Sequence, residues 1–479
     1  MSIYLSIDLG TTGCRSILFD KELTPISYAY EEYGLITPKE KWVEQDANLW
    51  WELTTRTAAA AIAKAGFDGS EIDSISISSQ GITAVPVDSE LNPMCLAHTW
   101  LDTRAEKEVE QIFSVFSKEE LYHMSGRELD ECYTLATLVW FKNNQPEIFN
   151  KAFKILMPMD FLIAKLTGKC VTDHSMASGT ILYDLREKAW SRKVLDAFEI
   201  SEGLLPSVAY SGEKVGCVLP EVAKQLGLRP DCVVAVGAQD QKCAAYGVGL
   251  DEGVMSISLG TAAAISKRWN EAKTEIDAGG CWCSYVLPDS FVTEGIIGTA
   301  GTCLRWTRDM LFKGESYSII DEEAKAARDR GSSLLFFPYL AGSATSDFSE
   351  EEGCFYGASL STVRGDFALA VMEGIAFKMR SILEAMKAYG NVHTLVLFGG
   401  GANSDLWCQI IADATGLKIS IPNTTEAAGA GAARLAAMAV GEELPPLKSE
   451  KYYTPSSLAA EYDKKYQRFK AVEKKLWNK

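Results

Sequence analysis

A short segment that occurs twice along the chain sets the strongest limit on its fold. Residues 6–11 read SIDLGT and residues 256–261 read SISLGT, so five of six positions agree at a spacing of 250 residues. A match of this length can arise by chance. In both copies, however, a β-favouring run enters a Gly-Thr turn and another β run follows, which is typical of a β-hairpin. The repeat therefore predicts two domains of related topology, residues 1–248 and residues 249–479.

The rest of the chain alternates helix and strand patterns. Asp46 is expected to cap a helix that runs to Ala65 and stops at Gly66. Ile72, Ile75 and Ile77 predict a strand, and the apolar run at residues 232–236 predicts a buried one. A chain of 479 residues has room for two or more domains. This alternation indicates the α/β class.

Composition excludes several classes of function. The chain has 47 Lys and Arg against 64 Asp and Glu, and a net charge of −17 argues against nucleic acid or an anionic membrane surface as the main partner. The four histidines are scattered, so the HExxH spacing of a zinc site is absent. No apolar stretch approaches the ~18–20 residues of a membrane span, and the N-terminus lacks the pattern of a signal peptide. We therefore expect a cytoplasmic protein with no membrane or nucleic-acid partner.

The C-terminal tail differs in charge from the rest of the chain. Residues 458–479 carry seven Lys or Arg and three Asp or Glu, a local net charge of 7 − 3 = +4. Apolar side chains recur there at spacings of three and four, at Tyr462, Tyr466, Phe469, Val472 and Leu476. This pattern favours an amphipathic helix packed on the second domain, with a partner-binding or membrane helix as the alternative.

The familiar phosphate-binding and nucleophile motifs are absent. There is no GxxxxGK[ST] and no GxSxG. Residues 429–433 (GAGAA) resemble a dinucleotide fingerprint only loosely and favour a helix of small residues packed closely on a neighbour. The two Gly-Thr turns are places where backbone N–H groups can hold a phosphate. Either turn alone reads as an ordinary hairpin, but two matched turns favour a clamp on a polyphosphate. Asp8, just before the first turn, suits Mg²⁺ bound through water.

Two further strand ends carry candidate site residues. Asp240 follows the strand predicted at 232–236, and sites of α/β proteins form at the carboxyl ends of strands. A carboxylate there can accept the proton of an attacking hydroxyl. Capping of a helix by Asp240 is the alternative role, and the two roles are compatible. Three glycines at 399–401 follow an apolar run at 395–398, which predicts either another close backbone approach or a tight connection.

Taken together, these motifs resemble the FGGY family of carbohydrate kinases, and the similarity runs the full length of the chain. In order, the matching stretches are residues 8–12 (DLGTT), 157–180, 237–240 (GAQD), 260–261 (GT), 353–357 (GCFYG) with 366–367 and 373–374, and 398–402 (FGGGA). No single stretch is decisive, whereas their common order is specific.

The resemblance implies a fold and a set of roles. The fold is two actin-like (ribonuclease-H-like) domains with a cleft between them, and the cofactors are ATP and Mg²⁺. Asp240 would be the catalytic base, and Asp8 and Asp240 would hold the metal. The residues that the resemblance assigns to ATP are Gly10, Thr11, Thr12, Gly260, Thr261, Gly301, Gly400, Gly401 and Ala402.

The acceptor side departs from the family pattern. Residues 79–82 (SQGI) stand where glycerol kinases carry QRE and xylulokinases carry QMH, and Thr137 stands where a Lys is usual. Residues 100–104 (WLDTR) resemble the WxDxR of xylulokinase-like and gluconokinase-like members. Trp100 is expected to offer an apolar face to the sugar, with a core Trp as the alternative. Because each hydroxyl both donates and accepts, polar side chains suit a polyol, and the predicted substrate-binding residues are Gln80, Trp100, Asp102, Arg104, Asp240 and Gln241.

These observations predict an ATP-dependent carbohydrate kinase that phosphorylates a hydroxyl of a sugar or polyol, a ketopentose such as xylulose. The alternatives are a kinase of gluconate or another polyol, an actin-like ATPase without a sugar substrate, and a sugar-sensing pseudokinase. The sequence leaves open which hydroxyl reacts and whether the chain forms a homodimer.

Overall fold

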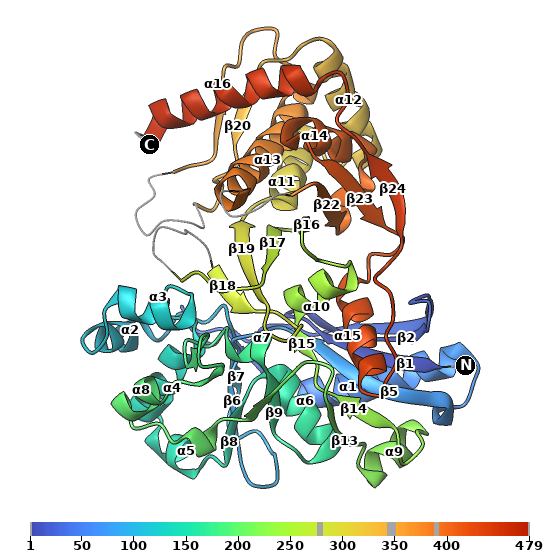
Figure 1. Ribbon diagram of the computed structural model, residues 1–479. Coiled ribbons are helices and arrows are strands. Elements are labelled where there is room, and N and C mark those ends of the chain that lie inside the picture. The colour runs from blue at the N-terminus through green and yellow to red at the C-terminus, as the bar shows by residue number, and fades with distance from the viewer. Residues whose placement is uncertain (1, 275–280, 343–350, 388–391, 478–479) are drawn as a thin grey trace. The chain divides into compact units, whose positions relative to one another are not determined.

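The computed structural model describes residues 2–274, 281–342, 351–387 and 392–477 (Figure 1). The chain divides into two compact units. The first consists of Met1–Gly249, Trp269–Thr293 and Glu426–Leu447, and the second of Leu250–Arg268, Glu294–Thr425 and Lys448–Lys479. Two segments, residues 269–293 and 426–447, thus group with the first unit, although the division predicted at residue 248 places them in the second domain.

Seven strands form the sheet of the first unit. Six follow the order β13-β14-β5-β1-β2-β3, and β15 pairs with β5 beside β14. Their bounds are β1 Ile3–Leu9, β2 Gly13–Asp20, β3 Pro25–Glu32, β5 Ile72–Ser79, β13 Lys214–Cys217, β14 Val233–Ala235 and β15 Ala238–Gln239. β1 and β2 pair antiparallel, so the predicted hairpin is confirmed. β1, β14 and β15 run parallel to β5, which makes this an α/β sheet.

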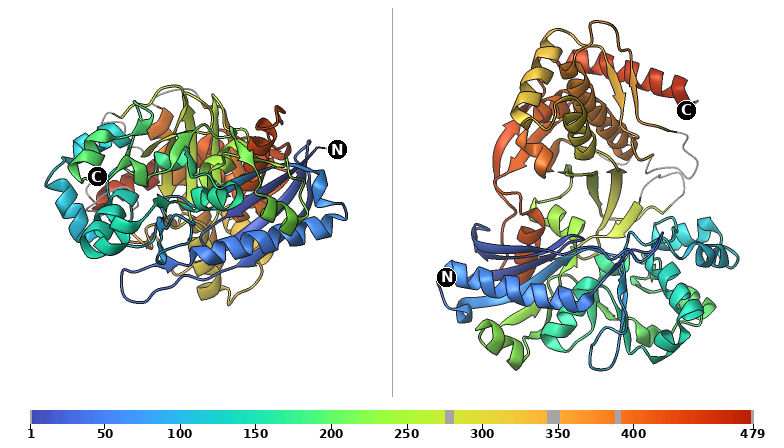
Figure 2. Two further views of the ribbon diagram at one scale, coloured as in Figure 1. Left: turned by 90° about the horizontal axis from the view of Figure 1, so that it is seen from below. Right: turned by 180° about the vertical axis from the view of Figure 1, so that it is seen from behind.

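Helix α1 (Ala47–Ala65) lies along one face of this sheet (Figure 2). Its Trp50 and Leu53 share a hydrophobic core with the odd-numbered residues of β1. The Asp46 side chain accepts from the N–H of Asn48 at the start of the helix, and Gly66 ends it in the left-handed region with φ 77°. The predicted helix, cap and stop are therefore confirmed.

The opposite face is covered by α15 (Ala427–Met438), a helix from near the end of the chain that belongs to the first unit. It packs against α10 (Asp240–Gly247), which lies beside it in Figure 1. A Cβ at Gly431 would overlap the carbonyl of Cys243, and one at Gly247 would overlap the carbonyl of Ala427. The prediction of a small-residue helix packed closely on a neighbour is confirmed.

The second sheet has the order β18-β19-β17-β16-β22-β23-β24. The bounds are β16 Val254–Leu259, β17 Ala263–Trp269, β18 Cys281–Ser284, β19 Phe291–Ile297, β22 Thr394–Phe398, β23 Lys418–Pro422 and β24 Ser449–Tyr453. The division between the units runs through β17 and β19. The hydrophobic core of the second unit includes Met255, Ile257, Leu259 and the buried face of α13 (Arg364–Lys387).

The repeat seen in the sequence is a repeat of structure. β16 pairs antiparallel with β17 and parallel with β22, as β1 pairs with β2 and β5. The connection differs by one residue. Leu9 pairs with Cys14 across the first turn, whereas Leu259 pairs with Ala263 across the second. Both units therefore present the same hairpin, with a slightly longer turn in the first.

The basic tail forms α16 (Ala459–Trp477) on the second unit. Tyr462, Tyr466, Phe469 and Val472 are buried in its core, which confirms the amphipathic helix. Leu476 is exposed instead of packed, and Trp477 packs against the core in its place. None of the described helices combines the length and apolar character that a bilayer span requires.

The remaining elements are short strands and connecting helices. They are β4 Glu44–Gln45, β6 Val85–Val87, β7 Ala97–His98, α2 Glu106–Phe113, α3 Lys118–Ser125, α4 Thr134–Asn144, α5 Pro146–Lys151, β8 Lys154–Leu156, α6 Pro158–Thr167, β9 Val171–Asp173, α7 His174–Ala177, β10 Tyr183–Asp184, β11 Ala189–Trp190, α8 Arg192–Ala197, β12 Ser207–Ala209, α9 Pro220–Leu226, α11 Gly301–Leu311, α12 Tyr317–Asp329, β20 Leu335–Phe337, β21 Cys354–Tyr356 and α14 Asp405–Thr415, with 3-10 turns at Gly69–Glu71, Glu202–Leu204 and Gly400–Asn403.

Candidate active site

Three neighbouring strands of the first sheet end at the same level. Leu9 at the end of β1 and Gln239 at the end of β15 both pair with Ser79 at the end of β5. The next residues along the chain are Gly10, Gln80 and Asp240, three of the predicted site residues. Neighbouring strands lie ~4.8 Å apart, so the sheet brings a glycine turn, an amide and a carboxyl to one edge. Ligands of α/β proteins bind at this carboxyl edge.

The first Gly-Thr turn is held by its carbonyl groups. The Tyr33 hydroxyl donates to the carbonyl of Gly10, Gln45 Nε2 donates to that of Thr11 over 2.7 Å, and the Tyr33 N–H donates to that of Thr12 over 3.0 Å. In a trans peptide the N–H of the next residue points opposite to the carbonyl. The N–H groups of Thr11 and Thr12 are therefore directed away from these anchors, where a phosphate oxygen could accept from them.

Asp8 is half-buried at the end of β1, directly before this turn. Its Oδ1 accepts from the Ser78 hydroxyl at 2.8 Å. Burial raises the pKa of the Asp8 carboxyl, while the Ser78 hydrogen bond and the Arg15 charge oppose that rise. A nearby cation would stabilise the charged form further.

The residues around Asp8 fit a metal ion that arrives with phosphate. No group of three or more His, Cys, Asp or Glu side chains able to hold a metal occurs in the part of the chain that the structure describes. Mg²⁺ keeps several of its waters and needs one or two carboxylates besides phosphate oxygens. Asp8 and Asp240 are oxygen donors of this kind, so the donor set suits Mg²⁺ better than an all-protein metal cage.

Asp240 is the first residue of α10, and Gln239 orients it. Gln239 caps the helix, because its Oε1 accepts from the N–H of Gln241 at 3.1 Å. Its Nε2 donates to Asp240 Oδ1, which also accepts from the Gln241 N–H at 2.7 Å. The alternative that Asp240 itself caps the helix is therefore wrong. These hydrogen bonds fix the position of the Asp240 carboxyl at the start of α10.

Gln80 belongs to a chain of buried hydrogen bonds. Gln80 is 2% exposed, and its Nε2 donates to Gln45 Oε1 over 2.8 Å. Gln45 Oε1 also accepts from the indole N–H of Trp50 at 3.2 Å. Gln80 Oε1 is buried and has no hydrogen-bond partner among the described residues. A buried amide oxygen of this kind is costly unless a donor reaches it.

Trp100 is 41% exposed, so the alternative that it is a core residue is wrong. Its indole N–H donates to the Thr11 hydroxyl oxygen over 2.9 Å. An indole N–H is only a donor, which leaves the Thr11 hydroxyl hydrogen available to an acceptor such as a phosphate oxygen.

Asp102 and Arg104 lie near this edge as a buried ion pair. Arg104 Nη2 contacts Asp102 Oδ2 at 2.6 Å and Glu44 Oε1 at 2.7 Å, and the Arg104 side chain is 2% exposed. The guanidinium lies 3.5 Å from the ring centroid of Trp42. Arg104 Nη1 is buried without a hydrogen-bond partner in the described ranges. The side chains of Asp102 and Arg104 therefore bind mainly to other protein groups, and Nη1 of Arg104 is the atom left for a ligand.

The second Gly-Thr turn, in the second unit, is held by a helix backbone. The N–H of Gly301 donates to the carbonyl of Gly260 at 2.9 Å, and the N–H groups of Ala300 and Thr302 donate to that of Thr261 at 3.0 and 3.1 Å. The first amides of α11 therefore bind this turn rather than a ligand. By the same peptide geometry, the N–H of Thr261 is turned away from the helix.

The glycines of the second unit fall into two groups. A Cβ at Gly301 would overlap the carbonyl of Gly260, and one at Gly401 would overlap the Leu259 side chain, so the fold requires both glycines. Gly400 has no atom within 4 Å of such a Cβ, and Gly260 has nothing closer than 3.9 Å. In the first unit Gly10 is similarly uncrowded, with its nearest neighbour at 3.7 Å. At these uncrowded positions a glycine leaves room for a ligand to approach the backbone. Ala402 is buried in the 3-10 turn that follows.

Sequence reasoning missed Tyr33, Gln45, Ser78 and Gln239. Each acts through a hydrogen bond to a predicted site residue. Gln239 had a visible signal, because it directly precedes Asp240 after a strand. Gln45 and Tyr33 had none, since the partners lie 34 and 23 residues away along the chain.

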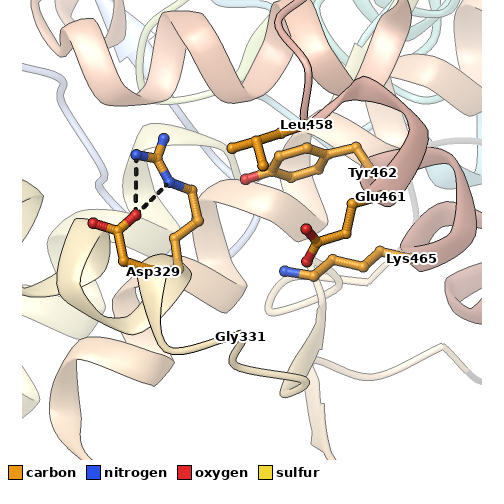
Figure 3. A pocket seen from close by; sticks show the side chains of 7 residues that line it. Asp329, Gly331, Leu458, Glu461, Tyr462 and Lys465 are labelled. Carbon is orange, nitrogen blue, oxygen red and sulfur yellow. Dashed lines mark hydrogen bonds and ion pairs between the residues drawn. The ribbon is translucent and has the colours of Figure 1, made fainter.

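The second unit contains a cavity of about 340 Å³ (Figure 3). Residues from α12 and α16 line it, and Asp329, Glu461 and Lys465 contribute charges of both signs. No predicted catalytic or binding residue lines it, so it is not the site considered above.

Comparisons with known proteins identify the family of the chain. The N-terminal domain of the FGGY family of carbohydrate kinases matches residues 3–247, and its C-terminal domain matches residues 255–440. A xylulose kinase of Lactococcus lactis subsp. lactis is 31% identical over 92% of this chain and 88% of its own length. Crystal structures of a ligand-bound xylulose kinase and of a gluconate kinase, both from Lactobacillus acidophilus, each show 25% identity and a TM-score of 0.91, covering 99% of this chain and 98% of theirs.

The family models together cover most of the chain, and the two α/β units agree with the actin-like architecture of the family. Membership implies an ATP-dependent phosphotransferase whose acceptor is an alcohol group. The chain has two related hairpins and a carboxyl at a strand end, and it resembles solved sugar kinases over its full length. We conclude that the chain belongs to the FGGY family of carbohydrate kinases.

Proposed function

We propose that the chain transfers the γ-phosphoryl group of ATP to a hydroxyl of a ketopentose, with xylulose as the preferred acceptor. The observation that carries the proposal is the common level at which β1, β5 and β15 end, followed by Gly10, Gln80 and Asp240. A phosphate turn, an acceptor-binding amide and a base at one sheet edge are the parts that phosphoryl transfer requires.

In the proposed reaction Asp240 accepts the proton of the attacking hydroxyl. Gln239 Nε2 and the Gln241 N–H hold its carboxylate in place. Gln80 Oε1 accepts from a second hydroxyl of the sugar, and Gln241 and Trp100 complete the acceptor site. Arg104 contributes through Nη1, which is buried without a hydrogen-bond partner among the described residues, and Asp102 holds the guanidinium in place.

The nucleotide is proposed to bind through both Gly-Thr turns. The N–H groups of Thr11, Thr12 and Thr261 stabilise phosphate charge, and Gly10 and Gly260 allow the close approach. In the second unit, Gly301, Gly400, Gly401 and Ala402 border the nucleotide. Asp8 and Asp240 would hold Mg²⁺, which neutralises phosphate charge when it is bound.

Gluconate is the rival acceptor, because the likeness to a gluconate kinase equals that to a xylulose kinase. Charge favours the neutral sugar. Arg104 already contacts the two carboxylates of Asp102 and Glu44, so one buried cation faces two anions. Adding a substrate carboxylate to this group would increase the excess of negative charge.

A coupled assay of ADP release tests the proposal with xylulose, ribulose, gluconate, glycerol and xylitol at equal concentrations. We expect the highest kcat/KM for xylulose. A higher value for gluconate would overturn the choice of acceptor. ADP release at the same rate with and without every sugar would instead indicate an ATPase, and sugar binding without ADP release would indicate a sensor.

Cytoplasmic location and a homodimer remain predictions. Light scattering coupled to size-exclusion chromatography measures the mass of the assembly and decides between one copy and two.

A further inference from the structure

Gln45 is a buried amide with no predicted role that contacts both halves of the proposed reaction centre. It is 1% exposed and lies in β4, directly before α1. Its Nε2 donates to the Thr11 carbonyl of the phosphate turn at 2.7 Å. Its Oε1 accepts from Gln80 on the acceptor side at 2.8 Å.

The orientation of this amide is set by partners that cannot change role. The Trp50 indole N–H is only a donor, and the Thr11 carbonyl is only an acceptor. If the Gln45 amide were turned over, its NH₂ would face the indole N–H and its oxygen would face the carbonyl. Both hydrogen bonds would be replaced by repulsive contacts in a buried site, which is costly.

The fixed amide of Gln45 in turn fixes Gln80. Because Gln45 offers its oxygen, Gln80 must present its NH₂ there. The oxygen of Gln80 is then the remaining end, buried and without a partner in the described part of the chain. Trp50 and Gln80 both donate to the oxygen of Gln45. The oxygen of Gln80 is therefore left as a hydrogen-bond acceptor at the strand end beside Asp240.

We propose that Gln45 is a positioning residue that orients Gln80 to accept from a sugar hydroxyl and holds the phosphate turn in its binding conformation at the same time. This inference rests on the proposed function in assigning the acceptor to Gln80 and phosphate to residues 10–12. It implies that one substitution perturbs the binding of two chemically different substrates.

Gln45→Glu tests this coupling with little change in size. A carboxylate can still accept from Trp50 and Gln80, but it cannot donate to the Thr11 carbonyl and places a negative charge beside it. Losing one such bond and gaining repulsion corresponds to about tenfold in an equilibrium constant. We expect KM for ATP to rise about tenfold while KM for the sugar stays near the wild-type value, because Gln80 still donates to the carboxylate. Gln45→Leu, which loses the contacts to both Thr11 and Gln80, should raise both KM values. Gln80→Leu should raise KM for the sugar alone.

Trp50→Phe tests whether the indole N–H sets the orientation of the Gln45 and Gln80 amides. Without the indole donor, only the Thr11 carbonyl sets the orientation of the Gln45 amide, so Gln80 is held less firmly. KM for the sugar should therefore rise, but less than in Gln80→Leu. Thr57→Val is the matched control, because Thr57 is buried in α1 and bonds to Ser16 and Cys14 of β2 but to neither Gln45 nor Gln80. It should lower the melting temperature without changing either KM.

The inference is overturned if Gln45→Glu folds and leaves KM for ATP unchanged, or if Thr57→Val and Trp50→Phe change the KM values equally. Should no sugar support ADP release by the wild-type protein, the proposed function fails separately. The dissociation constant of a non-hydrolysable ATP analogue then still tests Gln45, since Gln45→Glu must weaken it and Gln80→Leu must not.

Discussion

The two Gly-Thr turns are nearly the same in sequence but are anchored by different means. The turn of the first unit is held through side chains, the Tyr33 hydroxyl and the Gln45 amide, together with the Tyr33 N–H. The turn of the second unit is held through the first backbone amides of α11. Residues distant along the chain thus anchor the first turn, whereas the start of a single helix anchors the second.

The residues after the strands differ in the same sense. In the first unit the strand ends lead to Gln80 and Asp240, and Asp8 precedes the turn. In the second unit Ser258 stands where Asp8 stands, and β22 leads into Gly399, Gly400 and Gly401. In the proposed function, the first hairpin would therefore carry the groups of proton and metal chemistry, and the second would contribute backbone contacts to the nucleotide.

The largest expected effect comes from the carboxylate that only the first unit carries after its strands. Asp240→Asn keeps the size and hydrogen-bonding reach of the side chain but removes the base. We expect kcat to fall about 10³-fold, with the dissociation constant of ATP changed less than threefold. Steady-state kinetics and calorimetry measure both. Asp231→Asn, at an exposed surface position, should leave kcat unchanged; an active Asp240→Asn enzyme would remove the assignment of the base.

The next prediction distinguishes a glycine that leaves room for a ligand from a glycine that the packing of the fold requires. Gly10→Ala has room for its Cβ, so the melting temperature should change little while the affinity for ATP falls at least tenfold. Gly301→Ala must push against the carbonyl of Gly260 and should lose about 1–3 kcal/mol of unfolding free energy. Denaturant unfolding and ATP titration of both variants check this. Equal loss of stability in the two would contradict the distinction.

A smaller effect tests how each turn is anchored. Tyr33→Phe removes the donor to the Gly10 carbonyl, and a lost hydrogen bond of about 1 kcal/mol should raise KM for ATP about fivefold. Thr302→Val removes a hydroxyl from the second turn, but the N–H groups of Ala300 and Thr302 still hold the Thr261 carbonyl. KM for ATP should then change less than twofold. A larger change in Thr302→Val than in Tyr33→Phe would reverse the comparison.

The smallest effect concerns pH. Burial raises the pKa of Asp8, and the Ser78 hydrogen bond lowers it. The charged form that suits Mg²⁺ is lost as pH falls through this pKa, so kcat/KM for MgATP should fall on the acid side. Ser78→Ala removes the lowering contribution and should move that acid limb to higher pH. Ser258→Ala, at the matching position of Asp8 in the second unit, should leave the pH profile where it is.

The elements that the sequence predicted correctly are those set by local chemistry. The hairpin of β1 and β2, the helix from Asp46 to Gly66 and the amphipathic α16 follow from alternation, capping and periodicity. Leu476 was placed wrongly in the buried stripe because the final turn of α16 packs through Trp477. Asp240 was correctly expected just after a strand. Gln239, the N-cap of α10, was overlooked, because the sequence does not show which of two successive polar residues caps the helix.

The repeat at residues 6–11 and 256–261 was enough to predict two related α/β hairpins, since turn and strand preferences act over a few residues. Tertiary structure decided what each hairpin can do. It placed Tyr33 and Gln45 against the carbonyls of one turn and α11 against those of the other, and it returned α15 from the end of the chain to the first sheet. Burial and hydrogen-bond direction depend on atoms far apart in sequence, and for this reason only the folded chain shows that Gln45 can orient Gln80.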